Sequence, residues 1–363
     1  MPQLRYTTPH GITVTRSASK IPYGRGLGKL LKQLDTQRGV YLSSGYEYPE
    51  RYSRWDVSSV APPIEIVGRG RQLEINALNR RGNVLIQLLN GVLKDHPHWE
   101  NFRIENDRLI GNLKPLADLF PEEERSKQPS PFSILRALIH EFRNPEDSHL
   151  VLVGAFGYDL LLQFDPITQR LPRHEQKALH LFLCDDIYFM DRKKEVIEHY
   201  RYDFAAGDLT TDGLPRHTPK IAPSKAPAGP REIVSDHRPE EYMANVETVR
   251  EGMRVGNYYE VVLRQTFSAP FDSSASDLFQ RVQKTSPSPY EFLLQMGDEQ
   301  LVGASPEMFV RVEGRRVETC PIAGTARRSG DPLRDAANIL ELLNSTKEES
   351  ELTMCSDVDR NDK

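Results

Sequence analysis

The chain has 363 residues, of which 38% are apolar and 27% charged, and its formal net charge is −5. This composition is typical of a globular protein with room for two domains, and the small negative charge gives no reason to expect a nucleic-acid partner. No apolar run approaches the roughly 18 residues of a membrane span, and the N-terminus lacks a secretory signal. The widely spaced Cys184, Cys320 and Cys355 fit reduced thiols, so we expect a cytoplasmic protein that binds no membrane.

Strand patterns dominate the first part of the chain. Residues 63–77 alternate apolar and polar side chains around a Gly-Arg-Gly turn, which predicts a β-hairpin. Residues 81–93 place leucine and valine at helical spacing, and the continuous apolar run 150–156 suits a buried strand. Residues 181–203 indicate a second hairpin with its turn at 191–194.

A change in composition separates this part from the rest. Residues 205–238 are rich in Pro, Gly, Ala and Thr and predict a surface linker between an N-terminal domain, 1–204, and a second domain, 239–363. Antiparallel strands set apart from helices predict an α+β fold class. The elements expected in the second domain are a helix over 239–255, a strand over 259–267, a helix over 276–284, strands over 291–296 and 307–318, and a helix from 335 to 354.

Two patterns resemble ligand sites but favour structural interpretations. Residues 21–30 hold several glycines and Lys29, yet the Walker spacing is absent and no strand precedes them, so a loop is favoured over a nucleotide site. His96 and His98 flank a proline, which in an extended segment would turn the rings apart, and solvated histidines are favoured over a metal site.

A pair of carboxylates near the end of the chain is more informative. Glu348 and Glu351 share one face of the predicted helix, where they could hold Mg²⁺ directly or through water. By spacing alone, a solvated face with a Lys347–Glu351 ion pair is the favoured alternative. Gly324 and Thr325 follow a predicted strand, and their N–H and hydroxyl groups could cradle a carboxylate or ring, although an ordinary turn is the alternative.

Several segments, in order, resemble the chorismate-utilising enzymes and specifically the large subunit, component I, of anthranilate synthase. The resemblance covers nearly the whole chain and is most similar to the fused form, in which a glutamine amidotransferase domain follows. The matching segments are 42–44, 51–53, 154–159, 261–263, 286–290, 303–307 (GASPE), 321–325 (PIAGT), 347–351 (KEESE) and 357–362 (DVDRND).

Two positions favour one branch of this family. The para-aminobenzoate branch has a lysine nucleophile where this chain has Ala323. The isochorismate and salicylate enzymes activate water with a lysine where this chain has Glu260. The resemblance therefore implies a lyase reaction at the start of tryptophan biosynthesis, in which chorismate and ammonia from a glutamine amidotransferase give anthranilate and pyruvate.

The resemblance also implies roles for the carboxylate region. Glu351 would be a Mg²⁺ ligand, and Glu348 would share the metal site near the departing 4-hydroxyl of chorismate. Gly324 and Thr325 would line the pocket for the ring.

A feedback site for L-tryptophan is implied between the two domains. Leu42, Ser44, Pro289 and Tyr290 match its residues. Glu291 stands where many members of the family have methionine, which leaves the affinity for the inhibitor open.

The family's catalytic domain continues beyond the DVDRND segment, so we expect this sequence to be truncated at its C-terminus. Residues that act together in a site are strongly non-additive, and the chain alone is therefore expected to be inactive. The alternatives are an inactive fragment, a tryptophan-binding module, or an aminodeoxyisochorismate synthase that stops before pyruvate is eliminated.

Overall fold

The structure, a computed structural model, describes residues 3–45, 54–117, 120–164, 167–168, 176–222 and 232–362. The chain divides into two compact units, one of residues 1–221 with 275–363 and the other of residues 222–274. Every strand pairing between described residues is antiparallel, and helices alternate with runs of strands, which confirms the α+β class. None of the described helices is both long and apolar enough to cross a bilayer.

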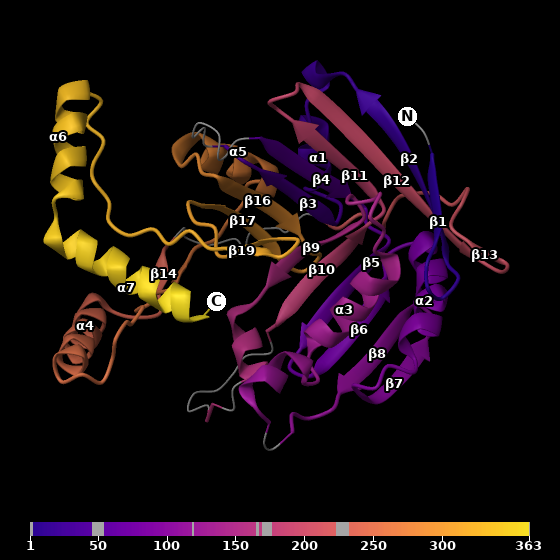
Figure 1. Ribbon diagram of the computed structural model, residues 1–363. Helices are drawn as coiled ribbons and strands as arrows, with labels where there is room; N and C mark the ends of the chain where they lie inside the picture. Colours follow the sequence, from indigo (N-terminus) through magenta and orange to yellow (C-terminus); the bar gives the residue numbers. More distant parts are fainter. Residues whose placement is uncertain are drawn as a thin grey trace. The chain divides into compact units, whose positions relative to one another are not determined.

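The larger unit contains a nine-stranded sheet in the order β1-β2-β12-β11-β4-β3-β16-β17, with β13 paired to β12. Figure 1 shows β16 and β17 continuing this sheet beside β3 and β4, although the two pairs lie far apart in the sequence. The strands are β1 (Leu4–Thr7), β2 (Thr13–Ile21), β3 (Gly39–Ser43), β4 (Trp55–Val60), β11 (Asp186–Asp191), β12 (Val196–Ala206), β13 (Leu209–Thr210), β16 (Tyr290–Gln295) and β17 (Gln300–Ser305).

A six-stranded sheet in the order β7-β8-β6-β5-β10-β9 belongs to the same unit. Strands β5 and β6 at its centre pair antiparallel, which confirms the hairpin predicted for 63–77. Gly70 allows the tight turn between them, since its φ of 53° lies in the left-handed region. The strands are β5 (Ile64–Arg69), β6 (Gln72–Ala77), β7 (Trp99–Glu105), β8 (Arg108–Leu113), β9 (Val151–Phe156) and β10 (Leu179–Cys184).

The hairpin predicted for 181–203 is only partly correct. The turn at 191–194 does join β11 to β12, but residues 181–184 belong to β10 in the other sheet. The chain crosses between the sheets at Asp185, whose buried carboxylate accepts hydrogen bonds from Arg81 Nε (2.6 Å) and Arg216 Nη1 (2.8 Å). The two arginines hold the chain at the point where it crosses. Both are distant from Asp185 in sequence, so the alternation of apolar and polar residues in 181–203 does not reveal the crossing.

Four α-helices of the larger unit cover the sheets: α1 (Gly28–Gln33), α2 (Arg80–Leu93), α3 (Pro131–Phe142) and α5 (Ala275–Thr285). Helix α2 confirms the helix predicted for 81–93; Asn79 caps it by accepting from Gly82 N at 3.0 Å, and Leu85 and Leu89 are fully buried. Helices α1 and α5 share a second core with Tyr41 and Leu293 of the nine-stranded sheet. Short 3₁₀ helices span Tyr23–Arg25, Glu122–Lys127 and Tyr158–Gln163.

The segment predicted as a linker begins inside β12, and its first part packs on the larger unit. Thr211 is fully buried, and Arg216 donates to Asp185 and to Asp203 (3.0 Å). The domain boundaries stay a prediction, to which the structure adds that β16 of the expected second domain pairs with β3 of the first.

The end of the chain forms two helices, α6 (Pro332–Leu343) and α7 (Thr346–Asp362), preceded by the hairpin β18 (Arg311–Glu313) and β19 (Arg316–Glu318). The single helix predicted from 335 to 354 is therefore wrong. Ser345 separates the two helices, and its Oγ accepts from the backbone N–H of Glu348 at 3.4 Å, which is a capping interaction.

The smaller unit contains α4 (Pro239–Arg254) and a two-stranded sheet of β14 (Val234–Ser235) and β15 (Phe267–Ser268). Helix α4 confirms the prediction for 239–255, whereas the strand predicted for 259–267 is wrong except at its end. A strand needs a neighbour to satisfy its backbone groups, and among the described residues only 267–268 find one, in β14.

Candidate functional site

Glu348 lies in the first turn of α7, three residues after the capping Ser345. Its carboxylate is therefore near the positive end of the helix dipole, where a negative charge is favoured. The pattern Ser345-x-x-Glu348 is the sequence signature of a helix start, and it is the signal by which the break before α7 could have been found.

The carboxylate of Glu348 packs directly against Gly324. Gly324 has a φ of +78°, and a Cβ at this position would lie 2.6 Å from Glu348 Oε2. Only glycine provides both this backbone conformation and this close approach. The structure thus brings together two residues that the sequence analysis assigned to one site.

The predicted ion pair on α7 is also present. Lys347 Nζ lies 3.0 Å from Glu348 Oε1 and 2.8 Å from Glu351 Oε2. The hydrogen bonds that Lys347 donates to the carboxylates of Glu351 and Glu348 raise the pKa of Lys347 above its usual value. The side chains of Lys347 and Glu351 are both solvent-exposed, that of Glu351 by 41%.

Glu348 differs from these two exposed residues. Its Oε2 atom is buried and has no hydrogen-bond partner among the described residues. An unpaired buried carboxylate oxygen is costly and calls for a cation or a donor.

Oxygen ligands of this kind suit Mg²⁺, which commonly takes one or two carboxylates together with water and substrate. Glu348 and Glu351 therefore fit one side of such a site. No group of three or more His, Cys, Asp or Glu side chains within the described ranges comes together to hold a metal without further ligands.

Of three further predicted residues, two flank Gly324 and one lies in the smaller unit. Thr325 is exposed beside Gly324, and Ala323 precedes it with a partly exposed methyl group. Glu260 is exposed in the smaller unit, in the segment that forms no strand.

A second group of predicted residues meets where β3 pairs with β16. Leu42 is opposite Phe292 and Ser43 is opposite Glu291. Ser44, Pro289 and Tyr290 flank these pairs, so the structure brings the five predicted inhibitor-site residues together at one end of the strand pair: Leu42, Ser44, Pro289, Tyr290 and Glu291.

Glu291 is only 1% exposed, and its carboxylate is held in place by two donors. Gln283 Nε2 donates to Oε2 at 2.7 Å and the backbone N–H of Ser288 donates to Oε1 at 3.1 Å. A Cβ at Gly45 would overlap this carboxylate. The acidic residue is therefore built into the strand junction.

Sequence reasoning missed the polar residues beside Glu291. Asp56 is fully buried; Ser43 Oγ donates to its Oδ1 at 2.8 Å, and Arg192 Nη2 reaches both carboxylate oxygens at 2.8 and 2.9 Å. These residues come from β3, β4 and the β11–β12 turn, and no local pattern links them. The RYS segment at 51–53, which carried part of the resemblance, lies outside the described residues.

Comparison with known families shows to which family the chain belongs. Residues 103–362, most of the chain, match the family described as chorismate binding enzyme. The chain belongs to this chorismate-binding enzyme family. The match begins within the region predicted as the N-terminal domain, so the family's characteristic sequence extends over both sheets.

Individual relatives of this chain carry a more specific description. An anthranilate synthase from Azospirillum brasilense is 42% identical over 99% of this chain and 49% of its own length. Anthranilate synthase component 1 from Vibrio cholerae is 26% identical over 95% of this chain and 69% of its own length. The chain thus spans about half the length of the A. brasilense relative.

A solved structure supports the fold. Anthranilate synthase component I from Streptococcus pneumoniae superposes with a TM-score of 0.54 at 23% identity, covering 87% of this chain and 62% of that one. The arrangement of antiparallel sheets and helices is therefore that of the chorismate-binding fold.

Proposed function

We propose that the protein to which this chain belongs is an anthranilate synthase of the component I type. It would act as a lyase that converts chorismate and ammonia into anthranilate, pyruvate and water, at the start of tryptophan biosynthesis. The observation that carries the proposal is the Glu348 carboxylate, with its unpaired buried Oε2 packed against Gly324. The similarity of nearly the whole chain to the A. brasilense enzyme supports the choice of reaction.

The absence of a lysine at two positions supports the ammonia-using branch. Ala323, directly before Gly324, offers only a methyl group, so no covalent adduct can form on this side chain. Glu260 cannot supply a cation to activate water for the competing reaction. Ammonia, delivered by a glutamine amidotransferase domain or subunit, is the nucleophile that remains.

Glu348 and Glu351 would hold Mg²⁺ beside the substrate. When bound, the ion would supply Lewis-acid chemistry to a substrate oxygen. The chain itself positions the carboxylates: the start of α7 favours the anionic form of Glu348, and the bare Cα of Gly324 leaves room for it. Lys347, which now neutralises both carboxylates, would give way to the divalent ion.

We place the reaction in the cytoplasm. Cys184, Cys320 and Cys355 are all free thiols, which suits a reducing compartment.

We also propose that the junction of β3 and β16 binds L-tryptophan as a feedback inhibitor. The pairing that gathers the residues from Leu42 to Glu291 supports this site. Glu291 puts a buried carboxylate where the apolar indole ring of tryptophan would rest. We therefore expect Glu291→Met to tighten inhibition by tryptophan. Tryptophan titrations of anthranilate formation test this in a chimera that carries this chain in place of the aligned region of the A. brasilense relative, with and without the substitution. Equal or weaker inhibition of the variant would contradict it.

A chimera provides the direct test of the reaction. In it, this chain replaces the aligned region of the A. brasilense relative, and the purified protein receives chorismate, Mg²⁺ and an ammonium salt. We expect fluorescent product with the mass of anthranilate, together with pyruvate. A product that retains the enolpyruvyl group would instead identify an aminodeoxyisochorismate synthase.

The same assay with residues 1–363 alone tests whether the chain is active by itself. We expect no turnover, since a partial set of cooperating groups does not give proportional activity. Robust anthranilate formation would contradict this expectation, and no product from the chimera either would favour an inactive fragment or a tryptophan-binding module.

A further inference from the structure

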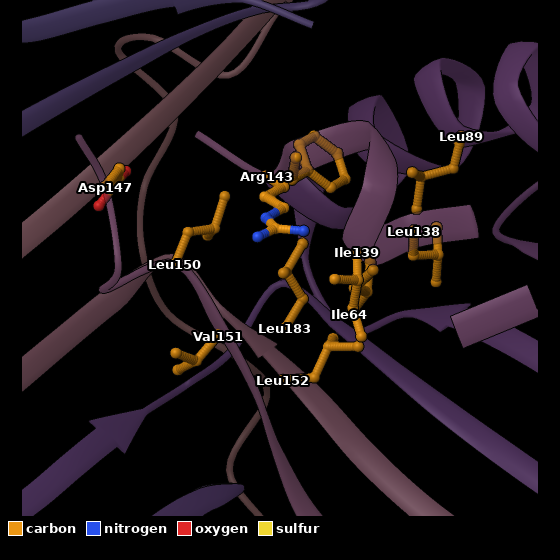
Figure 2. A pocket seen from close by; sticks show the side chains of 11 residues that line it. Ile64, Leu89, Leu138, Ile139, Arg143, Asp147, Leu150, Val151, Leu152 and Leu183 are labelled. Atoms are coloured by element: carbon orange, nitrogen blue, oxygen red, sulfur yellow. The ribbon is translucent and has the colours of Figure 1, made fainter. Parts of the chain in front are cut away.

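A cavity of about 150 Å³ lies in the larger unit between the six-stranded sheet and helices α2 and α3. Figure 2 shows aliphatic side chains from both layers pointing into it. They come from β5, β9 and β10 on one side and from α2 and α3 on the other, and no residue of the Glu348–Gly324 pair takes part. The apolar lining is Ile64, Leu89, Leu138, Ile139, Phe142, Leu150, Val151, Leu152 and Leu183.

The deep part of this lining is rigid core. Ile64, Leu89 and Leu138 are at most 4% exposed and belong to the main hydrophobic cluster, which also contains Leu183. An apolar cavity of about this volume is large enough for a benzene-sized molecule. The space is thus suited to one six-membered ring with few substituents.

A cation stands at the mouth of the cavity. Arg143 follows the last residue of α3, is exposed, and has no hydrogen bond or ion pair with any described residue. Figure 2 shows its side chain reaching in among the aliphatic groups, near Leu150 and Leu183. A guanidinium with free donors beside an apolar space matches a ligand carboxylate, which it can hold through two parallel hydrogen bonds.

The other charged lining residue, Asp147, has its partners elsewhere and forms no ion pair with Arg143. Asp147 is already paired: its Oδ1 accepts from Arg16 Nη1 and from Tyr202 Oη, each at 2.9 Å. In Figure 2 Asp147 lies on the other side of Leu150 from Arg143. The Arg16 guanidinium balances the negative charge of Asp147, although Asp147 Oδ2 is buried and has no hydrogen-bond partner among the described residues.

A neighbouring hollow lacks this combination. It is larger, about 530 Å³, and shares Ile139, Val151 and Leu152 with the first. Its own cation, Arg136, already donates to the carbonyl of Ser126 at 3.0 Å. Of the two arginines, the one without a hydrogen-bond partner among the described residues, Arg143, lines the smaller cavity.

We propose that the cavity beneath α3 binds a small aromatic monocarboxylate with a single ring, with the ring among Leu89, Leu138 and Leu183 and the carboxylate on Arg143. This inference does not rest on the proposed reaction, because it uses neither the carboxylates of α7 nor Gly324. The site would let the protein respond to aromatic acids at a position that the chemistry does not use.

Benzoate is the probe, and methyl NMR of isoleucine, leucine and valine side chains is the measurement. We expect benzoate to shift the methyl signals of Leu138, Ile139 and Leu183 by its ring current. Benzamide, which has the same shape without the charge, should bind at least tenfold more weakly to the native chain.

Arg143→Gln and Arg136→Gln form a matched pair of variants. Both remove one exposed positive charge from α3 or its end, but only Arg143 lines the cavity. We expect Arg143→Gln to weaken benzoate binding at least tenfold and Arg136→Gln to leave it unchanged.

Three results would overturn the proposal. They are an absence of methyl shifts at millimolar benzoate, shifts confined to other parts of the molecule, and equal affinity of the native chain for benzoate and benzamide. The benzamide comparison needs no variant, so the test remains decisive even if a substitution disturbs folding.

Discussion

Gly324 shows how one residue can set the geometry of the candidate site. Its positive φ and its contact with Glu348 are separate constraints, and Gly330 shares only the first: its φ is +82°, but nothing lies within 4 Å of a Cβ there. The two glycines therefore allow the effect of backbone strain to be separated from the displacement of the Glu348 carboxylate.

We expect Gly324→Ala to lower anthranilate formation by the chimera about 100-fold, since a displacement of about 1 Å in a site can have that effect. Gly330→Ala carries the same backbone penalty and should leave the rate within about twofold. Initial rates by fluorescence give the comparison. Equal losses in the two variants would mean that the contact with Glu348 has no functional role.

The reactivity of the Cys184 thiol depends on its protonation state. The thiol is fully buried, and this burial raises its pKa to about 12. A raised pKa keeps the thiol neutral through the ordinary pH range, and the neutral form is the unreactive one. We therefore expect no modification of Cys184 by a thiol reagent in the folded chain between about pH 7 and 10, and full modification in denaturant. Peptide mass mapping checks this, and rapid labelling of native Cys184 at neutral pH would contradict it.

At the scale of elements, α5 anchors β16 and β17 to the nine-stranded sheet. Phe279 is fully buried, and the centroid of its ring lies 5.5 Å from that of Tyr41 in an edge-to-face arrangement. Its neighbour Ser276 donates to Asp35 Oδ2 at 2.7 Å, a contact with the turn after α1. The helix therefore connects the later segment of the chain to the earlier one.

Removal of the Phe279 side chain should destabilise the chain by about 3–5 kcal/mol, the usual effect of Phe→Ala in a core. Leu333→Ala on α6 is the matched control, because Leu333 is 83% exposed and should change stability by less than about 0.5 kcal/mol. Urea unfolding of both variants measures the difference. Similar midpoints for the two would contradict the anchoring role of α5.

Elements with strong local patterns could be predicted from the sequence, and those that depend on distant partners could not. The β5–β6 hairpin and α2 follow from alternation and helical spacing, with Asn79 as the cap. The assignment of β10 and β11 to different sheets depends on Arg81 and Arg216, which are distant in sequence from Asp185. The division into α6 and α7 was predictable in principle from Ser345 and was missed.

In the molecule as a whole, resemblance to a family predicted two clusters of candidate site residues, and the structure brings residues of each cluster close together. The Gly324–Glu348 contact joins a turn to a helix start, and the β3–β16 pairing joins residues near position 42 to those near 290. Neither contact follows from periodicity. The buried network of Asp56 and Arg192 stayed hidden because isolated polar residues carry no pattern.

We propose that this chain supplies the carboxylate side of a chorismate site through Glu348. The most direct measurement compares Glu348→Gln with Glu349→Gln in the chimera, using initial rates of anthranilate formation. Glu349 is exposed on the same turn of α7, so its variant controls for the loss of one negative charge there. We predict that Glu348→Gln lowers the rate at least about 100-fold, as for other essential carboxyl groups, while Glu349→Gln stays near the parent rate. An unchanged rate in Glu348→Gln would contradict the account.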